Sequence, residues 1–194
     1  MQEPDVTLTD FALAALAFGF AGALAADGGV AALFAGVFAA LGLAAFLGAL
    51  SHGWFTDRGH GAGAAIWLAT MLAMGLASAF LWLIAARLFG LAPWLGAAVA
   101  WGQLALLAGL AIFVTRNFFL ASGFSLPPTL ALLAGFAWGG HWLGVAGLGL
   151  ALAGAVQQAL GIRGLGLSHN ALYHVIQAAA FVLVFLAVPA VAGG

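Results

Sequence analysis

The chain has 194 residues, of which 66% are hydrophobic and only 5% are charged, and its formal net charge is −1. A water-soluble domain carries about a quarter charged residues, so the composition excludes a soluble globule. It predicts an all-α, polytopic integral membrane protein.

The missing residue types exclude further classes. No lysine is present, so a retinal Schiff base cannot form and a seven-helix rhodopsin is excluded. No cysteine is present, which excludes disulfides and thiolate metal sites. The chain has no polybasic run, so nucleic acid is not expected as a partner. The start, residues 1–10, lacks the basic region of a secretory signal, and we expect no cleaved leader.

Seven apolar segments predict a single seven-helix transmembrane domain, residues 1–194. A bilayer span needs about 20 apolar residues. The predicted spans are residues 9–26, 29–51, 62–88, 92–114, 118–138, 141–161 and 169–190. The connections between them are too short for a second domain. Glycine and alanine occur in every span, a pattern that suits close packing of helices in lipid.

Three residues at the edges of these spans need comment. Asp10 is predicted to cap the first span, with a role as a carboxylate of a polar site as the alternative. Pro127 and Pro128 either kink the fifth span or mark its first turn.

The arginines predict the orientation. With seven spans, the N-terminus shares one side with the second, fourth and sixth connections, which contain Arg58, Arg116 and Arg163. Only Arg87 lies on the opposite side. The excess of positive charge on cytoplasmic loops therefore places the N-terminus in the cytoplasm.

Most of the polar side chains share that predicted cytoplasmic face. They are His52, Asp57, His60, His169, Asn170 and His174, with Gln157 and Gln158 near the end of the sixth span. At about 100° per residue, Asn170, His174 and Gln177 fall on one stripe of the seventh helix, whereas His169 does not share a face with His174. His141 lies on the opposite side, where it and Trp142 are predicted to anchor the chain at the interface.

This cluster could hold a metal. Neutral imidazole is the commonest metal ligand, and a catalytic zinc takes about three protein ligands and a water. His52 and His174, joined by His60 or Asp57, would provide that set, and the bound water would attack a carbonyl carbon. Asp57 is alternatively the general base or the residue that orients a ligand, and Asn170 is predicted as a catalytic group beside His174. The competing interpretation is structural: Ser168 caps the last helix, Asn170 satisfies its first turn, and His60 is a loop histidine.

Two stretches resemble one family of membrane proteins. The last span opens with "SHNALYHVIQAAAF" (168–181), and the second ends with "LGALSHGWF" (47–55). Both resemble the superfamily that joins the alkaline ceramidases with the progestin and adipoQ receptors. That resemblance implies seven helices, a zinc ion bound between the end of span 2 and the beginning of span 7, and hydrolysis of a lipid amide. His52 and His174 match its ligand positions.

The chain departs from that pattern at three positions. Asn170 stands where the family has a second histidine of the last span, Gly48 where it has a serine, and His60 where it has an aspartate. Two alternatives therefore stay open, a bound zinc and a metal site that has been rearranged or lost. The resemblance also suggests a prokaryotic branch, and we expect a bacterial inner membrane.

The sequence thus supports two main hypotheses. The first is an integral membrane hydrolase, with or without zinc, that cleaves an amide or ester bond of a membrane lipid at the histidine cluster. The second is a non-catalytic protein, either an accessory subunit of a larger membrane complex or a receptor for a small ligand. Its partners would be membrane subunits or further copies of the chain. A proton-coupled transporter is less favoured, because neither a repeat nor a carboxylate at mid-span is evident.

Overall fold

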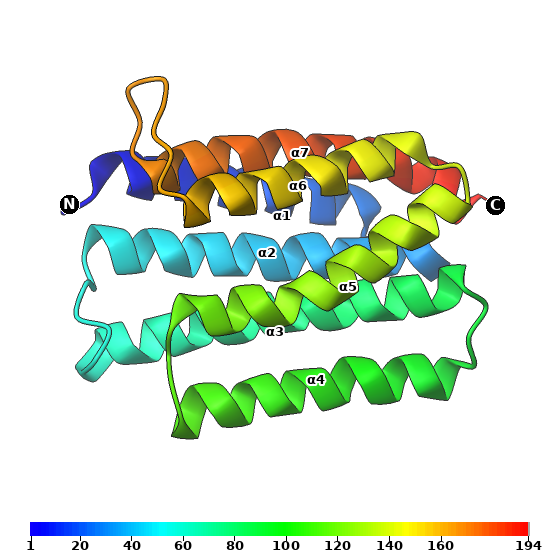
Figure 1. Ribbon diagram of the computed structural model, residues 1–194, viewed down its shortest axis with the longest axis horizontal. Helices are drawn as coiled ribbons and strands as arrows, with labels where there is room; N and C mark the ends of the chain where they lie inside the picture. Colours follow the sequence, from blue (N-terminus) through cyan, green and yellow to red (C-terminus); the bar gives the residue numbers. More distant parts are fainter. Residues whose placement is uncertain (194) are drawn as a thin grey trace.

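The computed structural model describes residues 1–193 and contains seven helices within them (Figure 1). These are α1 (Pro4–Leu24), α2 (Gly29–Gly53), α3 (Gly61–Leu88), α4 (Pro93–Phe113), α5 (Phe118–Trp138), α6 (Trp142–Ala159) and α7 (His169–Ala192). Each is long and apolar enough to cross a membrane. The chain is therefore an all-α integral membrane protein with a seven-helix bundle, as its composition predicts.

The first helix begins earlier than the sequence predicts. It starts at Pro4, five residues before the expected position, because a proline at the first helical position has its φ angle already set for a helix. The polar residues that follow fit inside the helix, since the Thr7 hydroxyl donates to the Glu3 carbonyl (2.7 Å). Asp10 lies well inside α1 and is buried. The prediction that Asp10 caps the helix is thus wrong.

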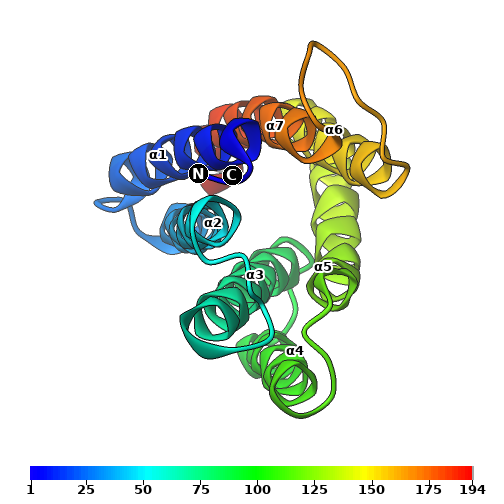
Figure 2. The same ribbon diagram turned by 90° about the vertical axis from the view of Figure 1, so that its left-hand side faces the viewer.

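The helices form a ring that is closed by the first and the last of them. Along the chain α1 packs on α2, α2 on α3, and α6 on α7, while α1 also packs on α7 (Figure 2). Helix α4 lies outside the ring, where it packs mainly on α3. The N-terminus and the loops 54–60, 114–117 and 160–168 lie together at one end of the bundle, hereafter the N-terminal end. The C-terminus lies at the other end (Figure 1).

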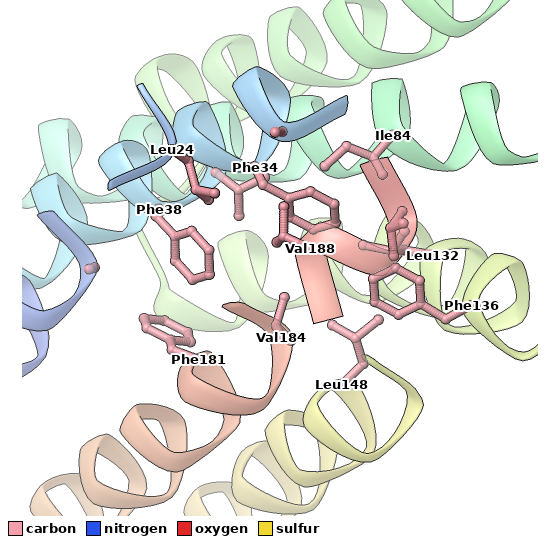
Figure 3. Packing of buried hydrophobic residues seen from close by; sticks show 14 of the residues in the cluster. Leu24, Phe34, Phe38, Ile84, Leu132, Phe136, Leu148, Phe181, Val184 and Val188 are labelled. Carbon is pink, nitrogen blue, oxygen red and sulfur yellow. The ribbon is translucent and has the colours of Figure 1, made fainter. Parts of the chain in front are cut away.

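A tightly packed apolar cluster fills the half of the bundle far from the N-terminal end (Figure 3). It joins the end of α1 to the beginning of α2 and α6 and to the end of α7. Phe34, Leu132, Phe136 and Val188 are among its fully buried members. The close packing depends on small residues, because a Cβ at Gly147 would lie 2.9 Å from the backbone nitrogen of Val184.

The two prolines lie inside α5, and neither marks its first turn. Because Pro128 has no N–H, the carbonyl of Phe124 one turn earlier has no helical donor. Gln103 of α4 supplies one, with its Nε2 donating to that carbonyl at 2.9 Å. Trp82 of α3 in turn donates its Nε1–H to Gln103 Oε1 at 2.7 Å. Gln103 therefore links three helices, as expected of an interhelical hydrogen bond.

Candidate functional site: a cavity with a polar mouth

A cavity of about 520 Å³ lies inside the ring, between α1, α2, α3, α5, α6 and α7. Its size is typical of small-molecule sites, which measure about 300–1,000 Å³. The deep part is lined by Phe38, Leu148, Phe181 and Val184, which also belong to the apolar cluster. The cluster thus closes the cavity on the side away from the N-terminal end.

The part of the lining near the N-terminal end is polar, and we call it the mouth. It consists of Asp10, His52, Arg58, Gln158, His169, Asn170, Tyr173 and His174. These residues come from α1, α2, α6, α7 and the loop 54–60, so the ring brings them together from distant parts of the sequence. The site therefore combines apolar walls with a polar end.

The innermost polar group of the mouth is a pair formed by Asp10 and His174. The Nε2 atom of His174 lies 3.2 Å from Oδ1 of Asp10, and the two side chains are only 11% and 6% exposed. The other ring nitrogen, Nδ1, lies 3.1 Å from the hydroxyl of Thr9. Both nitrogens of the imidazole are thus engaged by α1. Asp10 needs such a partner, because a carboxylate is costly to bury alone.

A glycine on α2 makes room for the carboxylate. A Cβ at Gly48 would lie 3.0 Å from Oδ2 of Asp10, tighter than ordinary contact. Gly48 is the position at which the resembling family has a serine. In this chain its lack of a side chain lets the carboxylate lie directly against the α2 backbone.

His52, at the end of α2, contacts one acidic and one basic side chain. Its Nδ1 lies 2.5 Å from Oε2 of Glu3, and its Nε2 lies 3.2 Å from Nη2 of Arg58. A carboxylate only accepts hydrogen bonds and a guanidinium only donates them. These contacts therefore fit a neutral imidazole that donates from Nδ1 and accepts at Nε2, which leaves neither nitrogen free.

Arg58 is held in the mouth by several neighbours. Its Cζ atom lies 3.8 Å from the ring centroid of the buried Trp67, a cation–π contact. Its Nε donates to Ser51 Oγ at 3.3 Å. Burial lowers the pKa of Arg58, and the charges of Glu3 and Asp10 oppose that shift. Within residues 1–193, no carboxylate oxygen lies within 4.0 Å of its guanidinium.

The loop that carries Arg58 lies against the first turn of α3. A Cβ at Gly63 would lie 2.1 Å from the carbonyl oxygen of Asp57, so only glycine fits at this contact. Trp67 also ties α3 to the loop 114–117, because its Nε1–H donates to the carbonyl of Arg116 at 2.7 Å. These contacts fix the mouth side of α3 and with it the ring on which Arg58 stacks.

Asp57 and His60 do not join the site. Their side chains are 70% and 91% exposed, and they lie 3.5 Å from each other on the surface. Asp57 accepts the backbone N–H of Gly59 at 3.0 Å, and this hydrogen bond is the main reason why its pKa is lowered. Neither residue lines the cavity. The structure does not bring them to His52 and His174, because the loop turns them outward.

The predicted zinc ligands therefore do not come together in this fold. No group of three or more His, Asp or Glu side chains in the described part of the chain is placed to hold a metal ion. His52 and His174 both lie on the cavity, but each is already hydrogen-bonded at both ring nitrogens. The donor set does not fit the zinc centre that the resemblance implies.

The polar stripe predicted for α7 faces the cavity. Asn170, His174 and Gln177 all line it, and so does His169 at the start of the helix. Asn170 Oδ1 accepts from Nε2 of Gln158 at 3.1 Å. This hydrogen bond ties α7 to α6 and gives the Asn170 side chain a structural role. Its catalytic role stays a prediction.

The start of α7 is capped in the expected way. The hydroxyl of Ser168 accepts the N–H of Ala171 at 3.3 Å, which confirms the predicted N-cap. The backbone N–H of Ser168 itself donates to Oδ2 of Asp5 at 2.9 Å. The first turn of α1 is thus attached to the start of α7, next to the mouth.

The sequence prediction omits two residues that matter here: Arg58 of the mouth, and Glu3, which contacts the mouth residue His52. Glu3 was outside the predicted first span, and only the early start of α1 brings it to His52. Arg58 served only to orient the chain in the membrane. Its place between a histidine at a helix end and a tryptophan in the second turn of the next helix is the only signal that the sequence offers.

Comparison with known proteins gives one match. Residues 6–192 match DUF6962, described as a family of unknown function. Neither the search of curated proteins nor the search of solved structures found a match. The resemblance to the alkaline ceramidases is not tested by these comparisons and stays a prediction. Because the match extends over nearly the whole chain, the protein belongs to the DUF6962 family.

Proposed function

We propose that the protein is a membrane-embedded hydrolase that binds a lipid-like molecule in the cavity and cleaves its ester or amide bond. The observation that carries this proposal is the buried pair of Asp10 and His174 in the wall of an otherwise largely apolar cavity. Ionisable groups inside membrane spans are costly and mark functional sites by default.

The cavity suits the apolar part of such a ligand. Its deep walls are phenylalanine, leucine and valine side chains, and burial of apolar surface against them stabilises a bound chain by roughly 25 cal/mol per Å². The polar mouth would hold the other end of the molecule. The carbonyl group then lies between the two, at the depth of Asp10 and His174.

The proposed chemistry uses this pair as the group that accepts and returns a proton. A water molecule attacks the carbonyl carbon, and the pair accepts its proton as the new C–O bond forms. The bond to the leaving oxygen or nitrogen then breaks, and the pair returns the proton to that leaving atom. Positioned acid–base groups of this kind contribute about 10²–10⁴-fold to a rate. Water supplies all the atoms that the products gain.

The test is hydrolysis by the purified full-length protein in detergent micelles, with long-chain ester and amide substrates and detection of the released fatty acid. We expect Asp10→Asn and His174→Gln to lower kcat about 10²-fold or more. Matched controls are Asp27→Asn and His141→Gln, in the loop after α1 and just before α6, which belong to the other end of the bundle. Equal rates in all four variants would refute the proposed roles.

A second function, binding without turnover, is favoured by one observation. Both nitrogens of His174 already contact α1, so the imidazole has no free lone pair toward the cavity. In that case a lipid co-purifies unchanged with the protein. Asp10→Asn and His174→Gln then slow the release of fatty acid no more than the control variants do. Partner subunits or a homo-oligomer, as predicted from the sequence, would then transmit the binding event.

The proposed setting is the inner membrane of a bacterium, with the N-terminal end in the cytoplasm. Arg58, Arg116 and Arg163 support this orientation, because all belong to loops at that end. The natural absence of cysteine makes the test simple. In intact cells a membrane-impermeant maleimide is expected to label Gly140→Cys and not His60→Cys. The reverse pattern would overturn the orientation.

A further inference from the structure

We propose that the ligand carries an anionic group, a carboxylate or a phosphate, which binds to Arg58 at the mouth of the cavity. The substrate class is then a single-chain anionic amphiphile. This inference rests on the proposed function in that it concerns the same cavity, but it is carried by a different residue.

The charges that line the cavity differ in whether they are paired. Only Asp10 and Arg58 among the lining residues carry a formal charge. Asp10 has His174 at 3.2 Å. Arg58 has no carboxylate within 4.0 Å in the described part of the chain. Two acids near Arg58 at the surface have other partners and do not line the cavity: Glu3 lies 2.5 Å from His52, and Asp57 lies 3.5 Å from His60.

The guanidinium is positioned in advance to bind an anion. Its Nε donates to Ser51 and its Nη2 contacts His52, and its face stacks on Trp67. These contacts leave Nη1 with no protein hydrogen-bond partner among the described residues. A planar guanidinium with free N–H donors matches the oxygens of a carboxylate or phosphate. Because these contacts already hold the side chain in one position, little further entropy is lost when the anion binds.

The neutral state of His52 strengthens this assignment. By accepting from Arg58 at Nε2 and donating to Glu3 at Nδ1, His52 orients the guanidinium without adding a second positive charge. It also separates Glu3 from Arg58, so the acid does not occupy the anion position. A cationic headgroup would meet the guanidinium directly and be repelled.

The size of the cavity limits the ligand. A volume of about 520 Å³ lies in the lower half of the range of about 300–1,000 Å³ for single small-molecule ligands. The apolar part therefore accommodates one chain. With that chain in the deep part and the anion at Arg58, the bond next to Asp10 and His174 lies between them.

The experiment compares amphiphiles that share one saturated chain and differ only in the headgroup: carboxylate, phosphate monoester, trimethylammonium and hydroxyl. Binding to the purified full-length protein in a neutral detergent is measured by native mass spectrometry. We expect both anions to bind about ten- to a hundredfold more tightly than the alcohol, the range for hydrogen bonds to charged groups. Inorganic phosphate alone is added as a competitor, and we expect it not to displace the anionic amphiphile.

Two variants locate the effect. Arg58→Gln is expected to remove the preference for anions, so that the carboxylate, the phosphate monoester and the alcohol bind with similar affinity, and their binding also shows that the cavity is intact. Arg163→Gln, at the same end of the bundle but outside the cavity lining, is expected to keep the preference. Arg58→Lys keeps the charge without the planar fork and should retain part of it.

Equal binding of the alcohol and the carboxylate, or a preference that survives Arg58→Gln, would overturn the inference. Displacement by inorganic phosphate would identify a free anion and not an amphiphile as the ligand, and would overturn it also. Binding of anions through Arg58 without cleavage of any ester or amide keeps this inference and refutes the hydrolase. Cleavage of neutral esters without an anion preference does the opposite.

Discussion

Gly48 of α2 lies against the carboxylate of Asp10 on α1, so closely that a Cβ at this position would come within 3.0 Å of Oδ2. This contact fixes the place of the acid. The imidazole of His174 holds Oδ1 from one side, and the backbone of α2 limits Oδ2 from the other.

Gly48→Ala is therefore expected to displace the carboxylate by a few tenths of an ångström and to lower kcat for lipid ester cleavage. Small misplacements of catalytic groups are costly, and we expect a loss of about tenfold or more. Gly22→Ala in α1 is the control, because a Cβ there meets open space. That variant should fold with equal or slightly higher stability, since glycine in a helix costs about 0.5–1 kcal/mol relative to alanine. An effect of equal size in both variants would contradict the argument.

The pair of Asp10 and His174 should also be visible in the stability of the fold. His174→Ala leaves the carboxylate buried without its imidazole, which we expect to cost about 1–3 kcal/mol. Asp10→Asn keeps the shape and a hydrogen-bonding side chain and should cost less. In the double variant the acid is gone, so the cost of His174→Ala should shrink. Thermal unfolding in detergent measures this coupling, and additive effects would mean that the two side chains do not interact.

Gln103 offers a test of how α4 is attached to the ring. Gln103→Leu removes the hydrogen bonds to Trp82 and to the carbonyl of Phe124. Interhelical hydrogen bonds in membranes average about 0.6 kcal/mol and reach about 1.7, so we expect a loss of about 1–2 kcal/mol in the free energy of unfolding. Pro128→Ala restores a helical donor to that carbonyl and should reduce the loss. If Gln103→Leu costs the same in both backgrounds, the proline is not the reason for the contact.

The exposed pair of Asp57 and His60 should matter little for function. We expect Asp57→Asn and His60→Ala to change binding and hydrolysis by less than about twofold, as for ordinary surface positions. The hydrogen bond from Gly59 lowers the pKa of Asp57 from its ordinary value of 3.8. Its stabilising effect on the loop is therefore present at neutral pH and is lost only as the pH falls through that lowered pKa. Loss of activity in either variant at neutral pH would revive the site predicted from the sequence.

The sequence predicts the helices well because their signal is local. Apolar length gives seven spans, and the 100° period places Asn170, His174 and Gln177 on one face of α7, where the structure shows them. The start of α1 was misjudged for the same reason: polar residues after Pro4 lack the apolar signal, although they are helical. The pairing of Asp10 with His174 is a contact between the first and the last helix, which no local pattern encodes.

The composition of the mouth could not be predicted in the same way. Whether a loop residue turns inward depends on contacts that no local pattern encodes. In the segment that carries Asp57, Arg58 and His60, the approach of Gly63 to the backbone and the stacking on Trp67 select Arg58 for the interior. Arg58 thus lies in the mouth, whereas Asp57 and His60, which have similar sequence signals, are exposed.

The contact between Asp10 and His174 joins residues that are made at opposite ends of synthesis. When α1 enters the membrane, its carboxylate has no imidazole beside it, and five more helices are inserted before α7 arrives. Until then the carboxylate of Asp10 is surrounded only by lipid and by the helices already inserted. The arrival of the last helix therefore completes the ring and converts a lone acid into an acid–base pair, so that a chain truncated before α7 lacks the pair altogether.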